Sequence, residues 1–112
     1  MNNLQHTNLD YLQATCGDSV EMMRSIIKMF IDSTPETLLE MRENIVDKNW
    51  DLLKRNAHKT KSSFMMFGAK QIGDTLQVIE LSSIAGNSNE LSNLLSDIEN
   101  KMDSIIDELK TV

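Results

Sequence analysis

The 112-residue chain contains few of the residues that build strands, sharp turns and disulfides. It has one cysteine, one proline and four glycines, and aromatic residues make up only 4%. Strands favour aromatic and β-branched residues, whereas this chain is rich in leucine, methionine, glutamate and lysine, which favour helices. The single cysteine, Cys16, excludes an intrachain disulfide and fits a reducing compartment. The composition therefore predicts an all-α protein.

Long apolar runs and an excess of positive charge are also absent. No run approaches the roughly 20 apolar residues of a membrane span, and no signal-peptide pattern opens the sequence, so we expect a cytoplasmic protein without a membrane partner. The net charge of −6 disfavours nucleic acid as a partner, because phosphate backbones attract basic surfaces. Hydrophobic residues at 40% suffice for one domain over residues 1–112, with its core over about residues 9–110.

Basic residues are concentrated in one part of this acidic chain. Between Leu52 and Gly73 there is no aspartate or glutamate. Five of the 11 basic residues lie there, namely Lys54, Arg55, Lys59, Lys61 and Lys70. A local basic patch on an acidic protein indicates a small anionic group or an acidic protein site as its partner.

The hydrophobic spacing predicts five or six helices joined by short connections, which pack as an antiparallel bundle. The first helix is expected to have Thr7 or Asn8 as its N-cap and to stop at Gly17. Asp18 and Glu21 resemble a capping box that opens the second helix. The inward residues of that helix are expected to be Val20, Met23, Ile27 and Phe30.

The remaining helices follow from caps and stops along the chain. Thr34–Pro35 predicts a third helix start, because a proline in the first turn loses no helical hydrogen bond. The next two helices are expected over residues 49–68 and 69–86, and Asn87 with Glu90 resembles a capping box for the last. The inward positions of these helices are Leu38, Met41 and Ile45, then Trp50, Leu53, Ala57, Thr60, Phe64 and Phe67, then Ile72, Leu76 and Ile79, then Leu91, Leu94, Ile98, Met102, Ile105 and Leu109.

Eight methionines give the chain adaptable core material. We expect the core to include Met22, Met23, Met29, Met41 and Met102. Met65 and Met66 are adjacent and cannot both be buried, so one of them is expected at an apolar rim that a partner could use.

His58 follows the inward position Ala57, so helical geometry rotates it about 100° from the core stripe. Its neighbours one turn away are cationic or small, namely Lys54, Arg55, Lys61 and Ser62. The imidazole is therefore expected at the exposed edge of the core with a cation close by. On this pattern alone, an ordinary surface histidine remains an alternative.

A carboxylate on the following helix could orient this histidine. In a hairpin that turns at Gly68–Ala69, Glu80 lies at the level of His58. A carboxylate that accepts a hydrogen bond from Nδ1–H would fix the tautomer and leave Nε2 as an outward nucleophile. Gln77 lies about one turn away and is the substitute if Glu80 points elsewhere. A solvated Glu80 without such a contact is the alternative.

An exposed imidazole beside a cation suits the transfer of a phosphoryl group. This reaction depends mainly on positioning and charge stabilisation, so a carrier needs few groups. Lys61 could supply the positive charge, with Lys54 or Lys59 as helpers. Ser62 adds little bulk beside the ring, and its hydroxyl could reach a phosphate oxygen.

The stretch AHKTKSS, followed by Gly68 and by IGDTLQVIE, resembles the signature of histidine-containing phosphotransfer (HPt) domains. The family pattern places a histidine, a lysine three residues later, a glycine ten residues later and a polar residue twenty-two residues later. His58, Lys61, Gly68 and Glu80 fall on these positions. The segments NWDLLKRNAH and FIDSTPETLLEMRENI are similar to the family's helical lead-in, so the resemblance covers about residues 9–109. One departure is Ser62, where the family usually has glycine.

The resemblance implies an antiparallel four-helix bundle with one or two short extra N-terminal helices, and a phosphoryl carrier that serves the receiver domains of a hybrid histidine kinase or a response regulator. The polar outer faces of the expected bundle favour a monomer. The resemblance also implies that His58 is the phosphoaccepting nucleophile, that Lys61 stabilises the phosphoryl group and that Glu80 orients the ring. Gly68 would then allow close approach of the partner. The chain would bind no cofactor, because the Mg²⁺ that the transfer needs belongs to the receiver. The residues expected at the partner interface are Lys54, Arg55, Lys59, Ser62, Met65 and Gly68.

Other functions receive less support from the sequence. A sensor kinase would need an ATP-binding domain with glycine-rich loops, which is missing. His6, Cys16 and His58 lack the spacing of metal ligands, and no Ser–His–Asp arrangement indicates a hydrolase. The main alternative is a helical adaptor that binds a receiver domain or another signalling protein without carrying phosphate. Such an adaptor would be expected to lose the histidine or its lysine, whereas this chain has both His58 and Lys61.

Overall fold

The computed structural model describes residues 6–17 and 19–111. Within these residues the chain forms helices and no strand. The elements are α1 (Asp10–Cys16), α2 (Val20–Val46), α3 (Trp50–Met66), α4 (Lys70–Ser82), a short 3₁₀ turn, η1 (Ser83–Ala85), and α5 (Ser88–Lys110). Among the described residues, no helix combines the length and the apolar character needed to cross a membrane.

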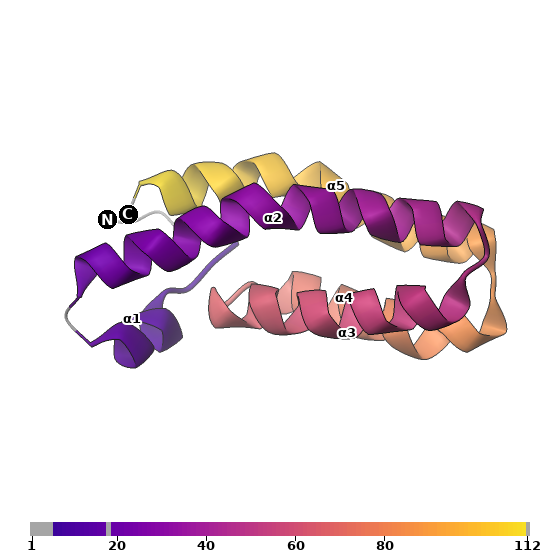
Figure 1. Ribbon diagram of the computed structural model, residues 1–112, viewed down its shortest axis with the longest axis horizontal. Helices are drawn as coiled ribbons and strands as arrows, with labels where there is room; N and C mark the ends of the chain where they lie inside the picture. Colours follow the sequence, from indigo (N-terminus) through magenta and orange to yellow (C-terminus); the bar gives the residue numbers. More distant parts are fainter. Residues whose placement is uncertain (1–5, 18, 112) are drawn as a thin grey trace.

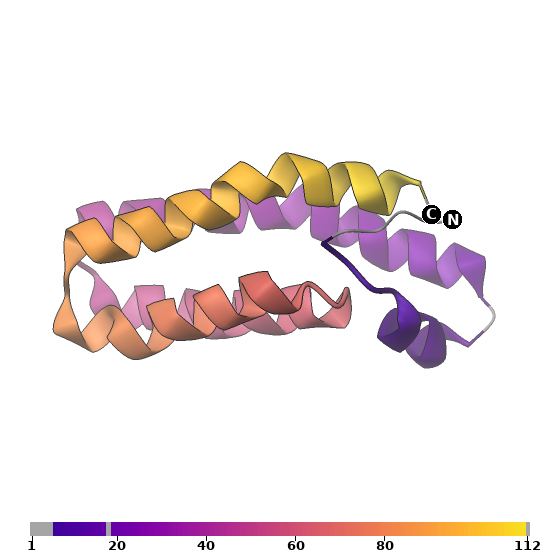
Figure 2. The same ribbon diagram turned by 180° about the vertical axis from the view of Figure 1, so that it is seen from behind.

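Helices α2 to α5 form an antiparallel four-helix bundle. Figures 1 and 2 show α2 beside α5 in one layer and α3 beside α4 in the other, with α1 at one end of the bundle. Each of the four long helices contacts the next around the bundle, and α5 closes it against α2. Short links join successive helices, which forces each to run opposite to the one before it. The predicted all-α four-helix bundle is confirmed, and of the one or two short N-terminal helices expected the described residues contain one, α1.

One continuous apolar core runs through the four helices. Phe30 of α2 meets Phe64 at the C-terminal part of α3 edge-on, with ring centroids 5.1 Å apart and an interplanar angle of 89°. Phe30 also contacts Phe67, which follows α3, at a centroid distance of 4.6 Å. Leu53 and Ala57, which precede Phe64 on the same stripe, are 0% exposed. This stripe attaches α3 to the bundle and therefore determines which of its residues face solvent.

Polar side chains cap three of the helices. Ser19 Oγ accepts the Met22 N–H at the start of α2, and Asn49 Oδ1 and Asn87 Oδ1 perform the same function for α3 and α5. The predicted cap Asp18 lies outside the described residues. These contacts satisfy backbone donors that a helix end leaves free.

The predicted N-cap of the first helix is wrong. Leu9 occupies the N-cap position of α1, and Asn8 Oδ1 accepts the Asp10 N–H from one residue further out. Thr7 is buried and its hydroxyl donates to Glu108 Oε1 at 3.0 Å. The Thr7 side chain therefore bonds to α5, near the other end of the sequence, and does not cap α1 as the local pattern predicts.

The predicted helix start at Thr34–Pro35 is also wrong, because α2 continues through both residues. Thr34 is 4% exposed and occupies a core position between Phe30 and Leu38. Spacings of three and four continue through Pro35 without a break, so one helix can bury the whole stripe. Packing of this stripe outweighs the cost of a proline inside a helix, which is about 3 kcal/mol.

Replacement of Pro35 with alanine is expected to stabilise the fold. Pro35 is exposed, so alanine restores a backbone donor to α2 without disturbing the core. We expect the free energy of unfolding in urea to rise by about 1–3 kcal/mol. Glu36→Ala, at the next exposed position, is the matched control and should change stability by less than about 0.5 kcal/mol. An unchanged or lower stability for Pro35→Ala would contradict this account of α2.

Several residues expected in the core are at the surface. Val20, Met22 and Met29 are 51%, 52% and 68% exposed. Leu94 is only partly buried, whereas its neighbour Leu95 is fully buried. The buried face of α2 is formed by residues such as Met23, Ile27 and Phe30. Met22 and Met29 each precede one of these residues, so they fall on the outer face of the helix. Met65 is 44% exposed and Met66 is partly buried, in agreement with the prediction that they cannot both be buried.

Candidate functional site

The fold places His58 on the solvent side of α3. The core residues Ala57 and Phe64 are 0% exposed, and the side chain of His58 is 65% exposed. A buried hydrogen bond from Asn56 Nδ2 to Asn44 Oδ1, 2.8 Å long, adds a polar connection between α3 and α2. Because both amides are buried, rotation of α3 would break this bond at a cost of about 1–3 kcal/mol. The helix therefore presents the imidazole outward in a defined orientation.

Glu80 of α4 reaches the ring of His58. Its Oε2 lies 3.0 Å from His58 Nδ1, and its side chain is only 16% exposed. An ionised carboxylate can only accept hydrogen bonds, so Nδ1 carries the proton in this contact. Nε2 of the same ring then has a free lone pair. The pair consists of a largely covered carboxylate and an exposed imidazole.

The second oxygen of Glu80 binds a lysine. Lys61 Nζ lies 3.4 Å from Glu80 Oε1, and the Lys61 side chain is 25% exposed. One carboxylate thus joins the histidine and the lysine through its two oxygens. The Lys61 ammonium is therefore paired with the same carboxylate that accepts the hydrogen bond from His58 Nδ1.

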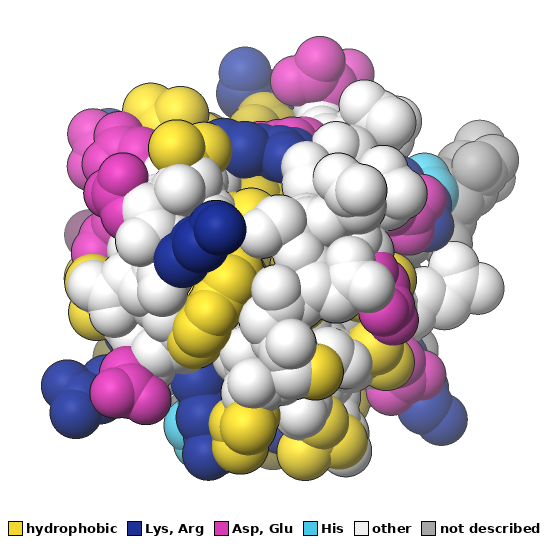
Figure 3. Space-filling model, turned by 90° about the vertical axis from the view of Figure 1, so that its right-hand side faces the viewer, with side chains coloured by type: hydrophobic (Ala, Val, Ile, Leu, Met, Phe, Trp, Pro, Cys, Tyr) yellow, Lys and Arg dark blue, Asp and Glu magenta, His cyan; other side chains and the backbone are white. Residues whose placement is uncertain are grey.

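A surface pocket opens beside the imidazole. Its volume is about 710 Å³, and it is lined by Asp51, Lys54, Arg55, His58 and Glu80. Figure 3 views the end of the bundle where α2 turns into α3 and α4 into α5. It shows a histidine at the margin of this end, with Lys or Arg side chains beside it and hydrophobic side chains along the same edge. The pocket has room for a phosphoryl group and for part of a partner.

The structure separates the predicted site residues into two groups. It brings Lys54, Arg55, Lys61 and Glu80 around His58. Glu80 and not the exposed Gln77 contacts the ring. Lys59 and Ser62 are exposed on α3 but do not line the pocket.

Met65 and Gly68 contact parts of the chain itself. A Cβ on Gly73 would lie 2.6 Å from Met65 Sδ, so the missing side chain of Gly73 makes room for Met65. A Cβ on Gly68 would lie 2.5 Å from the backbone oxygen of Asn8, whose N–H donates to Phe67 O at 2.8 Å. In this structure the segment that approaches Gly68 is thus the N-terminal segment of the same chain. A contact of Gly68 with a partner stays a prediction.

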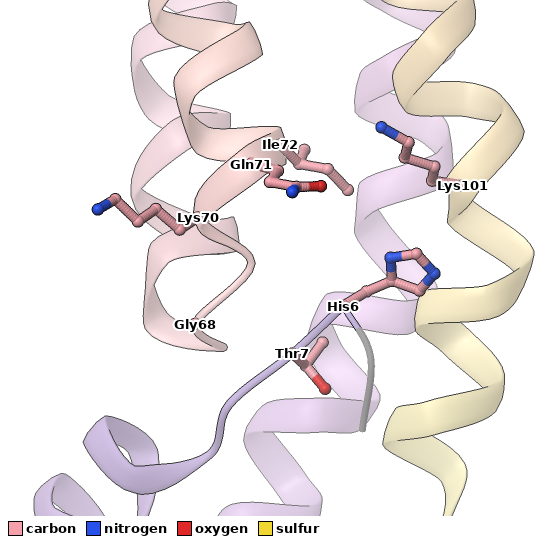
Figure 4. A pocket seen from close by; sticks show the side chains of 7 residues that line it. All are labelled: His6, Thr7, Gly68, Lys70, Gln71, Ile72 and Lys101. Carbon is pink, nitrogen blue, oxygen red and sulfur yellow. The ribbon is translucent and has the colours of Figure 1, made fainter. Parts of the chain in front are cut away.

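A second pocket of about 170 Å³ lies at the α3–α4 turn, away from the pocket at His58. Figure 4 shows the N-terminal segment passing between the α3–α4 turn and α5. Glu108 of α5 holds this segment by accepting the backbone N–H groups of His6 and Thr7 at 3.0 and 3.2 Å. The residues that line this pocket are His6, Thr7, Gly68, Lys70, Gln71, Ile72 and Lys101. None of them lines the pocket at His58.

Two residues of the site were missed in the sequence. Asp51 lines the pocket, and its position two turns before His58 on the same face of α3 was the available signal. Gly73 was given no function from the sequence, because the space that it leaves for Met65 depends on the α3–α4 distance. In the part of the chain that the structure describes, no three His, Cys, Asp or Glu side chains lie close enough to hold a metal ion.

Comparison with known proteins identifies one family. The family model described as Hpt domain matches residues 25–111, which include α3, α4, α5 and most of α2. No curated protein and no solved structure matches the chain. The matched region contains His58, Glu80 and Lys61 and leaves α1 outside.

Proposed function

This chain belongs to the Hpt domain family, and we propose that it carries a phosphoryl group on His58 Nε2 between aspartates of receiver domains. At the family level, Hpt domains act as histidine phosphotransfer carriers in phosphorelays and interact with receiver domains. The proposed carrier atom is His58 Nε2, and the proposed partners are the receivers of a hybrid histidine kinase and of a response regulator. The reaction is expected in the cytoplasm, with Mg²⁺ bound by the receiver.

The observation that carries the proposal is an exposed imidazole whose Nδ1 is held by Glu80. In the forward step the Nε2 lone pair attacks the phosphorus of a receiver aspartyl phosphate. The bond between phosphorus and the acyl oxygen breaks, and its electron pair returns to the aspartate carboxylate. Nδ1 keeps its proton, so the ring becomes positively charged and the Glu80 carboxylate stabilises it. The reverse sequence, at the aspartate of a second receiver, restores the neutral ring.

The experiment that tests this function is transfer from receivers that have been phosphorylated on aspartate. The chain is incubated with several labelled receiver domains and Mg²⁺, and the label on each protein is followed with time. We expect the chain to become labelled and the receiver to lose label, with a product that is labile in acid and stable in base, as a phosphoramidate is. Receiver binding without any label on the chain would contradict the proposal and favour an adaptor that carries no phosphate.

Substitution of Glu80 is expected to slow transfer without unfolding the bundle. Glu80→Ala removes a charge-assisted hydrogen bond to the ring, which is worth about 1.5–3 kcal/mol, so acceptance of the phosphoryl group should slow by roughly 10- to 150-fold. Glu80→Gln retains a hydrogen-bond acceptor but not the charge, and it should lie between Glu80→Ala and the wild type.

The control is Gln77→Ala on the exposed face of α4, which should transfer at the wild-type rate. The helical circular dichroism of all three variants should match that of the wild type. Equal rates for Glu80→Ala and Gln77→Ala would show that Glu80 does not orient the nucleophile.

A further inference from the structure

The two ring nitrogens of His58 face different surroundings. On the Nδ1 side lies Glu80, whose two oxygens contact Nδ1 and Lys61 Nζ. The pocket beside the ring is lined by Lys54, Arg55 and Asp51 as well as by Glu80. Because Nδ1 and Nε2 occupy different edges of the imidazole, a group on Nε2 projects away from the Glu80 contact.

Lys61 is engaged by a largely covered carboxylate. Its Nζ lies 3.4 Å from Glu80 Oε1, and the side chains of the two residues are 25% and 16% exposed. If Lys61 moved to a phosphoryl group, this carboxylate would lose its lysine partner in a place where water is scarce. Such a move would break this ion pair and leave the positively charged ring as the partner of Glu80.

Helix geometry directs His58 toward the preceding turn. The Cα–Cβ bonds of an α-helix tilt toward its N-terminus, so a side chain covers the surface about one turn before its own position. For His58 that turn contains Lys54 and Arg55, four and three residues earlier. The pocket agrees with this direction, because every α3 residue that lines it besides His58 precedes His58.

Lys54 and Arg55 are available to bind an anion. Both are exposed, and neither forms a salt bridge with any residue that the structure describes. The planar guanidinium of Arg55 can donate two parallel hydrogen bonds to phosphate oxygens, whereas an ammonium acts as a point charge. Asp51 contributes one negative charge to the same pocket, which the two cations outnumber.

We propose that the phosphoryl group on His58 is bound by Arg55 and Lys54, whereas Lys61 serves to hold and neutralise Glu80. This inference rests on the proposed function, because it assumes that His58 Nε2 is the phosphorylated atom. It differs from the assignment of the phosphoryl contact to Lys61 that the sequence resemblance implies. Arg55 and Lys54 are thus phosphate-binding residues, and Lys61 is a positioning residue that acts through Glu80.

The test uses chemical phosphorylation, which needs no partner protein. Phosphoramidate transfers its phosphoryl group to Nε2 with cleavage of its P–N bond and release of ammonia. The 112-residue chain with His6→Gln is used, so that His58 is its only histidine. The pH at which the bound phosphoryl group titrates is measured by ³¹P NMR for Arg55→Gln, Lys54→Gln, Lys61→Gln and Lys59→Gln. Each variant removes one positive charge, so the comparison isolates its position.

We expect Arg55→Gln to raise the titration midpoint by about 0.5 pH units, because a cation near the phosphoryl group favours its dianion. Lys54→Gln should give a smaller rise of the same sign, and Lys61→Gln should resemble the control Lys59→Gln. The largest rise in Lys61→Gln, or equal rises in all four variants, would overturn the inference and leave the proposed function intact. Absence of any ³¹P signal from His58 in the parent chain would instead contradict the proposed function itself.

Discussion

Replacement of His58 with glutamine is expected to abolish transfer of label from a phosphorylated receiver to this chain. Glutamine has a similar reach and remains polar, but its amide nitrogen has no lone pair available for attack on phosphorus. Label on His58→Gln should fall to the level of a reaction without the chain. Gel autoradiography and mass spectrometry of the labelled peptide would measure the loss and locate the modified residue.

The matched control is the chain's only other histidine. His6 lies at the opposite end of the bundle and donates its backbone N–H to Glu108, with its Nε2 3.9 Å from a Glu108 oxygen. His6→Gln should therefore accept label at the wild-type rate. Because the His58 side chain is 65% exposed and a glutamine amide can donate to Glu80 in place of Nδ1–H, His58→Gln should change the free energy of unfolding by less than about 0.5 kcal/mol. Label that persists in His58→Gln, or disappears in His6→Gln, would assign the phosphorylated atom elsewhere.

Truncation of Phe64 to alanine is expected to cost about 3–5 kcal/mol of stability. Phe64 is 0% exposed and meets the Phe30 ring edge-on, so its removal leaves a cavity between α2 and α3. A domain of this size has about 5–15 kcal/mol of stability in total, so the loss is a large fraction. Urea denaturation followed by circular dichroism would measure the shift of the midpoint.

The control for this loss is Met29→Ala. Met29 is 68% exposed on α2, so its truncation removes a similarly large apolar side chain without a cavity, and the change should stay within about 0.5 kcal/mol. Equal losses for the two variants would show that Phe64 does not anchor α3 to the core. In that case the packing that presents His58 would have to come from other contacts.

The position of His58 could be predicted because it depends on one helical period. Ala57 and Phe64 are on the buried stripe, so the residue after Ala57 turns outward regardless of the details of packing. The level of Glu80 relative to His58 followed from the hairpin, since both residues are about equally far from the turn, and the structure then selected Glu80 over Gln77 as the contact. Helical periodicity and a short connection between two helices are enough to predict which residues lie at the same level.

The continuity of α2 could not be read from its local signals. Thr34 and Pro35 have the composition of a helix start, but the buried surface on both sides of them favours one long helix. The same limit affected Met22 and Met29, because spacings of three and four permit two adjacent faces and only the partner helices select one. Capping preferences contribute about 1 kcal/mol each, which a shared core easily exceeds.

By itself, the sequence determined the helical class, the antiparallel packing of the helices, the outward direction of His58 and its level relative to Glu80. These features depend on hydrophobic period and chain connectivity, which are local properties. Only the tertiary structure decided that Glu80 also engages Lys61, that the pocket at the ring contains Arg55 and Lys54, and that Thr7 binds Glu108. Such contacts depend on which side chains come together once the helices have packed. Thr7 and Glu108 are too far apart in the sequence for any local pattern to predict their contact.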